Sequence, residues 1–218
     1  MTSPEAAIRS TVRRLPENQV DDPARLAEVL AAGVVAQVGV VQDGWPYAVP
    51  VGYAPWRDGV VIHGSTASRL FKLLAGGAPM CLTVTHLDGL SLARSAFHSG
   101  MSYRSAMLFG TCVPLTGEDK AAALADLTEH LLPGRWEHVR HPSVQEDKAT
   151  MVLYLVPTAW SLKISAGFED HAEDIEAYPE LWAGLVPLRV VADEPIPDDA
   201  ASQVPVPPHV SDLRHIRR

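Results

Sequence analysis

A helical pattern of apolar residues comes first along the chain. Asp22 is a good N-cap residue, Pro23 suits the first helical turn, and apolar side chains then recur at helical spacing until Gly33. We therefore expect a short helix over about 23–32.

Strand patterns follow this helix. The runs VVAQVGVV, PYAVPVGYA and VVIH are rich in β-branched residues and are separated by turns at Asp43-Gly44 and Arg57-Asp58-Gly59. They predict an antiparallel meander. Pro46 and Pro50 cannot donate ladder hydrogen bonds, so the middle strand should lie at an edge or carry a bulge.

Helices and strands alternate in the next part of the chain. Ser65 or Thr66 can cap a helix over 67–74. Thr116 with Asp119 resembles a capping box that opens another helix. Further strands are expected at MCLTVTH, 103–115, MVLYLV and WSLKIS. Antiparallel strands with inserted helices indicate an α+β fold, mainly antiparallel β, built on a barrel.

The periodic pattern fades after Ser165. Six of the 18 prolines lie at or after Pro187, among acidic runs such as Asp193-Glu194. We expect one folded domain over 1–165. Residues 166–218 should form an extension that ends in an extended or partly disordered arm and is not an independent domain.

Composition and charge narrow the classes of function. The 218 residues are 47% hydrophobic and 20% charged, which is enough apolar material for one core. A net charge of −8 disfavours nucleic-acid binding, because that needs a concentrated positive surface. No apolar run is long enough to span a bilayer, and the N-terminus lacks the apolar region of a secretory signal. We expect a cytoplasmic protein with no membrane partner.

Motifs of several familiar sites are missing. The chain has no G-x-G-x-x-G, G-x-x-x-x-G-K-[ST], G-x-S-x-G or H-E-x-x-H. Cys81 and Cys112 lie in strand-like segments without C-x-x-C spacing, which is typical of free thiols. The nine histidines are scattered, so no metal site is expected.

The segment HGSTASR, residues 63–69, has the layout of an anion site. A strand ends in small residues, and a helix begins with Arg69 in its first turn. Helix N-termini present free N–H groups, and arginine adds a bidentate charge. The same spacing also fits an ordinary capped helix with a solvated arginine, and Lys72 one turn later fits a solvated side chain.

A second unusual segment is SGMSYRS, residues 99–105. Arg104 enters an otherwise apolar strand, where an unpaired guanidinium would be costly. It must either pair with a carboxylate or face a ligand. Tyr103 can stack on a planar ring or pack as an ordinary strand residue.

These segments resemble a known family. HGSTASRL, CLTVTHLDGLSLARSAFHSGMSYRSAMLFG, LPGRW, SLKISAG and LWAGLVPL are similar to the flavin-nucleotide-binding branch of the pyridoxamine 5′-phosphate oxidase-like superfamily, close to the nitroimidazole-reductase-like proteins. The resemblance runs from about Val12 to Leu188. It implies an FMN-binding split β-barrel with Greek-key topology, and a homodimer with flavin sites at the subunit interface.

The resemblance also assigns residues to the cofactor site. Ser68 and Arg69 match the pair that holds the FMN phosphate, and Lys163 matches a family lysine. Ser102 stands where relatives commonly have Asn, and HSG replaces a more usual His-His-Ser run. The cofactor-binding residues implied are His63, Gly64, Ser65, Ser68 and Arg69, then Thr83, Val84 and Thr85 behind the isoalloxazine ring, and Tyr103, Arg104 and Ser105 beside it.

The expected activity follows from this cofactor. FMN would take a hydride from NAD(P)H and pass electrons to a small acceptor such as a nitro compound or a quinone. His63 matches a family active-site histidine and would act as the catalytic proton donor, unless it is a strand-end histidine bonded to backbone. Relatives of this fold also bind deazaflavin or haem, and His63 or His98 could then be an axial ligand. A flavin-binding module without turnover is the remaining alternative.

Overall fold

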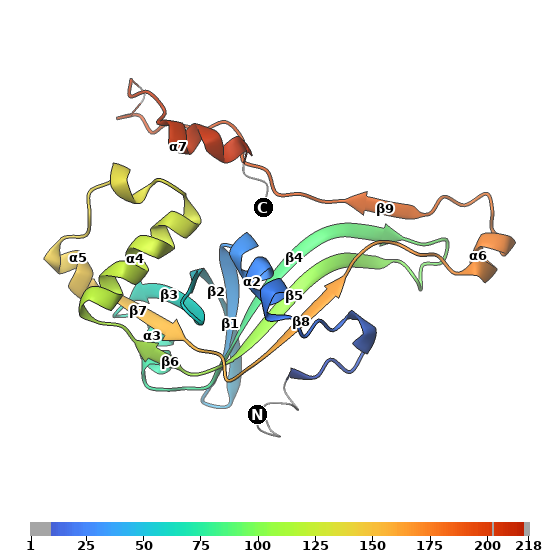
Figure 1. Ribbon diagram of the computed structural model, residues 1–218, viewed down its shortest axis with the longest axis horizontal. Helices are drawn as coiled ribbons and strands as arrows, with labels where there is room; N and C mark the ends of the chain where they lie inside the picture. Colours follow the sequence, from blue (N-terminus) through green and yellow to red (C-terminus); the bar gives the residue numbers. More distant parts are fainter. Residues whose placement is uncertain (1–9, 202, 216–218) are drawn as a thin grey trace.

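The computed structural model describes residues 10–201 and 203–215 of the chain. Within these ranges the strands form one antiparallel sheet in the order β6-β7-β3-β2-β1-β4-β5-β8, with β9 paired to β4 (Figure 1). The sheet curls into a half-barrel with helices packed around it. The predicted α+β fold, mainly antiparallel, is confirmed.

The elements have the following bounds. The strands are β1 (Val35–Gln42), β2 (Trp45–Trp56), β3 (Gly59–Ser65), β4 (Met80–Leu92), β5 (Gly100–Gly110), β6 (Cys112–Pro114), β7 (Thr150–Leu155), β8 (Ala159–Ser165) and β9 (Gly184–Pro187). The helices are α2 (Pro23–Ala32), α3 (Arg69–Ala75), α4 (Gly117–Leu131), α5 (Val144–Ala149), α6 (Ala172–Ala177) and α7 (Pro208–Ser211), with short 3-10 helices η1 (Pro16–Asn18), η2 (Trp136–His138) and η3 (Asp212–His215).

The inner face of the curled sheet holds the main core. Side chains of β1, β2, β4 and β5 pack there with α2 and α3, and Tyr53, Leu82 and Leu108 are fully buried. A smaller cluster lies between the outer face of β2 and β3 and helix α4, around Trp56 and Leu127. The β2–β3 region is therefore covered on both faces.

The first predicted helix is confirmed as α2, with Asp22 accepting a hydrogen bond from the Ala24 N–H. The second is confirmed as α3, but it begins later than predicted and its N-cap is Ser68. The Ser65 hydroxyl accepts from the Ala67 N–H and closes a separate turn before the helix. The prediction of a cap at Ser65 or Thr66 is therefore wrong.

Thr116 is the N-cap of α4, as predicted, but its side chain makes no capping hydrogen bond. The predicted capping box is therefore absent there. A reciprocal box forms instead at α5, where the Ser143 hydroxyl and the Glu146 carboxylate each accept from the other residue's backbone N–H.

Two of the three prolines of β2, Pro46 and Pro50, lie in the half of the strand with one open edge. β2 pairs with β1 along Trp45–Gly52, but with β3 only along Tyr53–Trp56. Pro46 and Pro50 both fall in the first half. The strand is central in the sheet order, yet its first half behaves as the predicted edge, where a missing N–H is tolerated.

The C-terminal extension is ordered where it is described. After β8 the chain turns at α6, returns along β4 as β9, and crosses to α7 on the far side of the molecule (Figure 1). Of this extension, Gly184–Pro187 is held by strand pairing to β4.

Three further observations bear on function. No helix in residues 10–201 and 203–215 is long and apolar enough to cross a membrane. The same ranges contain no cluster of three or more His, Cys, Asp or Glu side chains placed to hold a metal ion. Cys81 and Cys112 are both free thiols, which confirms that prediction.

Candidate functional site

The sheet opens between β2 and β3. Beyond Ile62, β3 leaves β2 and pairs only with β7, as far as Ser65 opposite Thr150. The first half of β2 is therefore exposed along one edge. Helix α3 starts directly after this opening, so the predicted anion segment lies next to an unpaired strand edge.

Arg69 reaches back across this opening. Its guanidinium lies over the ring of Tyr47 on β2, 4.7 Å from the ring centroid. The Ser68 side chain makes no capping hydrogen bond. A phosphate could bind here, because the site combines the Arg69 cation, the free Ser68 hydroxyl and the first turn of α3.

Gly64 brings α3 close to β3. A Cβ placed on Gly64 would lie 2.4 Å from the ring of Phe71. Only glycine allows this close approach, and Phe71 in turn fixes the start of α3 where Ser68 and Arg69 lie. Gly64 therefore positions the group without offering a side chain to a ligand.

His63 points to the side of β3 opposite Gly64, because neighbouring side chains in a strand alternate. No side-chain hydrogen bond of His63 occurs among the described residues, so the predicted backbone-bonded alternative is not seen. Surrounding protein lowers the pKa of His63 through desolvation. The lowered pKa favours the neutral ring, which suits a ligand nitrogen better than a proton donor.

The β4–β5 residues form a second group. Thr85 lies opposite Ser105, and their hydroxyl oxygens are 3.1 Å apart. Thr83 is on the same outer face of β4. Val84 points to the other face, is only 1% exposed and packs in the core. Its side chain therefore does not lie on the face that carries Thr83 and Thr85.

Arg104 pairs with a carboxylate. Its Nε and Nη2 donate to the two carboxylate oxygens of Asp88 at 2.8 and 2.7 Å. These bonds lower the pKa of Asp88 and raise that of Arg104. Of the two alternatives left open by the sequence, the structure shows the ion pair. Tyr103 lies next to it in the strand, half-buried and opposite Leu87 and Ser165.

The two groups are not brought together within one chain. β3 and α3 are separated from β4 and β5 by β2 and β1 in the sheet. In the described residues no hydrogen bond or ion pair joins the segment 63–69 to the residues 83–85 or 103–105. A single chain therefore presents two separate half-sites.

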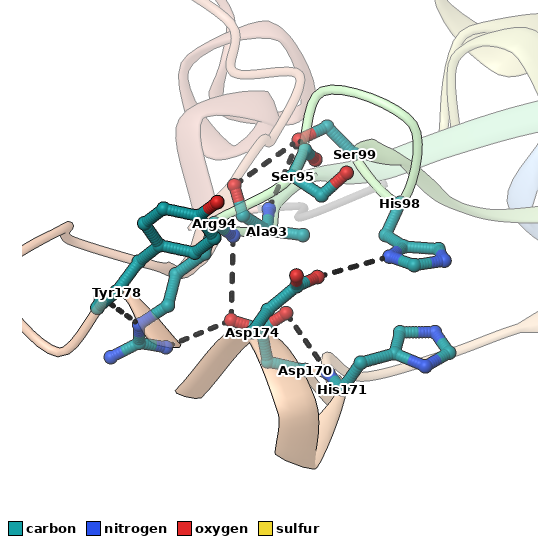
Figure 2. A network of polar contacts seen from close by, with 9 residues as sticks. All are labelled: Ala93, Arg94, Ser95, His98, Ser99, Asp170, His171, Asp174 and Tyr178. Carbon is teal, nitrogen blue, oxygen red and sulfur yellow. Dashed lines mark hydrogen bonds and ion pairs between the residues drawn. The ribbon is translucent and has the colours of Figure 1, made fainter. Parts of the chain in front are cut away.

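A third group lies at the end of the long β4–β5 ribbon. Figure 2 shows the loop after β4 tied to the segment around α6. Arg94 Nη1 donates to Asp170 at 2.8 Å, and Asp170 is almost fully buried. His98 Nδ1 lies 3.3 Å from Asp174, and its ring stacks on His171 with centroids 3.6 Å apart. His98 is thus engaged on one edge and one face.

Two functional features were missed by the sequence. Nothing in the strand run PYAVPVGYA singles out Tyr47, and only its contact with Arg69 marks it. A large cavity next to Tyr47 was not anticipated either, because it depends on where two distant strands part. Its walls come from Gly39, Val40, Val41, Pro46, Tyr47, Ala48, Pro79, Met80, Cys81, Phe109, Gly110, Thr111 and Thr158.

Comparison with protein families found one match. The model of the pyridoxamine 5′-phosphate oxidase family covers residues 22–164, which include both half-sites. A comparison with curated proteins found no match.

Comparison with solved structures found relatives over almost the whole chain. The FAD and heme binding protein from Mycobacterium smegmatis is 40% identical with a TM-score of 0.85, covering 90% of this chain and 97% of that one. The flavocytochrome Anf3 from Azotobacter vinelandii is 36% identical with a TM-score of 0.86, covering 94% and 96%. A putative 5-nitroimidazole antibiotic resistance protein from Bacteroides thetaiotaomicron, 20% identical with a TM-score of 0.57 over 67% and 86%, shares the fold.

Proposed function

The chain belongs to the pyridoxamine 5′-phosphate oxidase family, and from this premise we propose that it is a redox protein that binds a flavin together with haem. The observation that carries the flavin part is the Arg69 guanidinium held over Tyr47 at the open edge of β2. The haem part rests on the two relatives that match most of the chain, because one is named as an FAD and heme binding protein and the other as a flavocytochrome.

The β3–α3 half-site would hold the flavin phosphate. Arg69 offers a charged pair of donors, and Ser68 offers a hydroxyl that its own helix does not use. A bound phosphate needs a nearby positive charge, and Arg69 supplies one in a chain whose net charge is −8. The same group suits FMN, which the sequence predicts, and FAD, which one of the relatives is named for.

A second copy of the chain would complete the site. The β4–β5 half-site, with Thr83, Thr85 and Ser105, lies away from Arg69 in the same chain. In a homodimer, the outer face of β4 and β5 from one subunit can lie against the β2 edge of the other. The proposed homodimer thus gives a role to both half-sites.

His63 is the better candidate for the haem iron. Desolvation lowers its pKa, which favours the neutral ring, and the ring has no hydrogen-bond partner among the described residues. His98, the other candidate from the sequence, is bonded to Asp174 and covered by His171. A haem ligand must turn a free ring nitrogen to the iron, and His63 meets that condition without rearrangement.

The proposed activity is electron transfer from NAD(P)H to a small acceptor. A bound flavin supplies hydride and single-electron chemistry and haem supplies single-electron chemistry, while the protein binds and orients them. Nitro compounds and quinones remain the proposed acceptors. A protein that stores flavin without turnover would bind the same cofactors and fail to oxidise NAD(P)H.

The test begins with the absorption spectrum of the purified protein and mass spectrometry of the molecules that heat releases. Arg69→Ala should weaken flavin binding by about 2 kcal/mol, or about 30-fold in Kd, and leave the Soret band in place. His63→Ala should remove the Soret band and leave the flavin. Arg57→Ala is the matched control for Arg69, because Arg57 also lies over an aromatic ring, at 3.9 Å from Trp56.

The outcomes separate the parts of the proposal. Unchanged flavin affinity in Arg69→Ala would remove the phosphate assignment. A protein that takes up neither haem nor either flavin would contradict the proposed function as a whole.

A further inference from the structure

The β4–β5 loop, residues 93–99, is held by several polar contacts although it lies at the far end of the β4–β5 ribbon (Figures 1 and 2). Arg94 donates to the Asp170 carboxylate at 2.8 Å and to the Tyr178 carbonyl at 3.0 Å. Ser99 closes the loop on itself, because its hydroxyl donates to the Ser95 carbonyl at 3.0 Å. The loop is therefore ordered by contacts within its own chain.

This ordered loop carries an exposed aromatic ring. Phe97 is 86% exposed, and its N–H donates to the Ser95 hydroxyl at 3.2 Å. The ring of His98 meets it edge to face, with centroids 5.1 Å apart. An aromatic side chain on a preformed loop loses little conformational freedom when it binds, which is the property of an interface anchor. Phe97 therefore indicates a docking surface.

An exposed apolar row leads to this loop along the ribbon. Leu90 of β4 lies directly opposite Met101 of β5 and Val186 of β9, so the three side chains share one face of the sheet. It is the face that carries Thr85 and Ser105, because Met101 and Ser105 are an even number of residues apart in β5. The surface proposed to meet a second copy thus continues as an apolar row toward Phe97.

The same chain carries an apolar cavity that could receive the loop. The cavity, of about 940 Å³, opens where β1 parts from β4 after Gly39, next to Tyr47. Pro46, Pro79 and Phe109 form part of its wall, and its lining, within the described residues, includes no charged side chain. Such a wall favours an uncharged, apolar occupant. The volume leaves room for an aromatic ring and part of the loop that carries it.

The dimensions of the two surfaces agree. The open edge of β2 runs from Trp45 to Gly52, about 24 Å at the usual rise per strand residue, with the cavity at its Trp45 end. β4 also runs about 24 Å from Thr85 to Leu92, and the loop follows directly. When Thr85 of one subunit lies near the Gly52 end of the other subunit's edge, Phe97 reaches the cavity.

We propose that the cavity of each subunit receives the β4–β5 loop of a second copy of the chain, with Phe97 as the anchor. This rests on the homodimer of the proposed function and extends it. By two-fold symmetry each subunit gives one loop and receives one, so two equal contacts close the dimer. The cavity adjoins Tyr47 and Arg69, so the incoming loop completes a wall beside the flavin-phosphate group. A single chain lacks this part of the site.

Cys81 allows a direct test, because its thiol is partly exposed and forms part of the cavity wall. Phe97→Cys places a second thiol against it across the proposed interface. Burial raises the pKa of the Cys81 thiol, so the reaction is run at alkaline pH with a short bis(methanethiosulfonate) cross-linker. Phe97→Cys should give a covalent dimer on a non-reducing gel, and Phe97→Cys combined with Cys81→Ser should give none. Val144→Cys, at an exposed position of α5, is the matched control and should stay monomeric on the gel.

A second measurement removes the anchor or fills the cavity. Phe97→Ser should raise the dimer dissociation constant about ten-fold or more in analytical ultracentrifugation, because a truncated anchor leaves its pocket unfilled. Ala48→Trp, which occupies the cavity from its own wall, should do the same. Val144→Ser should leave the constant unchanged. Melting curves establish that each variant is folded before the constants are compared.

Several results would overturn the proposal. Cross-linking of Phe97→Cys that persists without Cys81 would place the loop elsewhere on the second copy. A dimer unaffected by folded Ala48→Trp would leave the cavity to a small ligand, and a monomeric wild type would leave the loop to a different protein. None of these readouts needs a cofactor. A dimer that cross-links as expected but takes up no flavin would support the interface and contradict the proposed function instead.

Discussion

Arg104 and Asp88 form a two-bonded ion pair at the bulge where β4 and β5 shift register between Leu87 and Gly89. Because the Arg104 hydrogen bonds lower the pKa of Asp88, the carboxylate contributes stability above its ordinary pKa, and this contribution is lost as pH falls through the lowered value. Asp88→Asn should make the free energy of unfolding less dependent on pH in the acidic range. It should also lower that free energy by about 0.5–1 kcal/mol at pH 7, a modest loss because the pair is partly exposed. Urea unfolding across acidic pH measures both effects. An acid limb identical to that of wild type would contradict the assignment.

The end of α2 is tied to the sheet by a buried tyrosine. Tyr53 is fully buried and its hydroxyl donates to the Leu30 carbonyl at 2.6 Å. Tyr53→Phe should destabilise the protein by about 1–2 kcal/mol, because this carbonyl at the helix end loses a buried donor. Tyr178→Phe, at an exposed position, is the control in the same urea titration. Equal midpoints for the two variants would show that the bond adds nothing.

Gly64 offers a test of α3 positioning. Gly64→Ala forces the Phe71 ring away from β3 and moves the start of α3, where Ser68 and Arg69 lie. We expect flavin binding to weaken by about 1–2 kcal/mol, together with a lower melting temperature. Gly100→Ala is a matched control, because a Cβ there meets nothing within 4 Å. The idea fails if the two variants bind flavin alike.

The C-terminal arm should dock in a pH-dependent manner. The ring of His209, in α7, lies tilted against that of His138, with ring centroids 4.3 Å apart, and neither buried ring nitrogen of His209 has a hydrogen-bond partner in the described ranges. Desolvation, and then the charges of His138 and Arg135, lower the pKa of His209, while Glu129 acts in the opposite direction. Because the pKa of His209 is lower in the docked arm, the undocked arm binds a proton more readily. Docking is therefore strongest above the ordinary histidine pKa of about 6.5 and weakens as pH falls below it.

Limited proteolysis of the arm checks this expectation. Cleavage near α7 should be faster at about pH 5 than at about pH 8, and His209→Phe should remove the difference. His141→Phe, which changes a histidine outside α7, should retain it. A pH effect of the same size in His209→Phe would assign the effect to other groups.

The sequence predicted local features well and long-range ones poorly. The segment 63–69 was found because small residues and an arginine follow a strand within a few positions. Val84 was included with Thr83 and Thr85 only because they are contiguous, although strand alternation turns it into the core. Asp88 as the partner of Arg104 depends on the register of β4 with β5, which no local pattern encodes.

The cavity illustrates the same limit. It exists because β1 leaves β4 after Gly39, and the hydrophobic pattern of β1 continues unchanged beyond that point. The contact between Arg69 and Tyr47 likewise joins a helix to a strand that only the folded chain places side by side. The local sequence pattern therefore identified the segment 63–69, but the position of Tyr47 beside it depends on the tertiary structure.

The open edge of β2 has a consequence for solubility. A strand edge that is free to receive a ligand is also free to pair with a strand of another molecule, which is how sheets aggregate. Pro46 and Pro50 remove backbone donors at two positions of this segment, so an incoming strand would find an interrupted ladder. The same prolines that mark the ligand-accessible edge thus protect the protein, before any cofactor is bound, from edge-to-edge self-association.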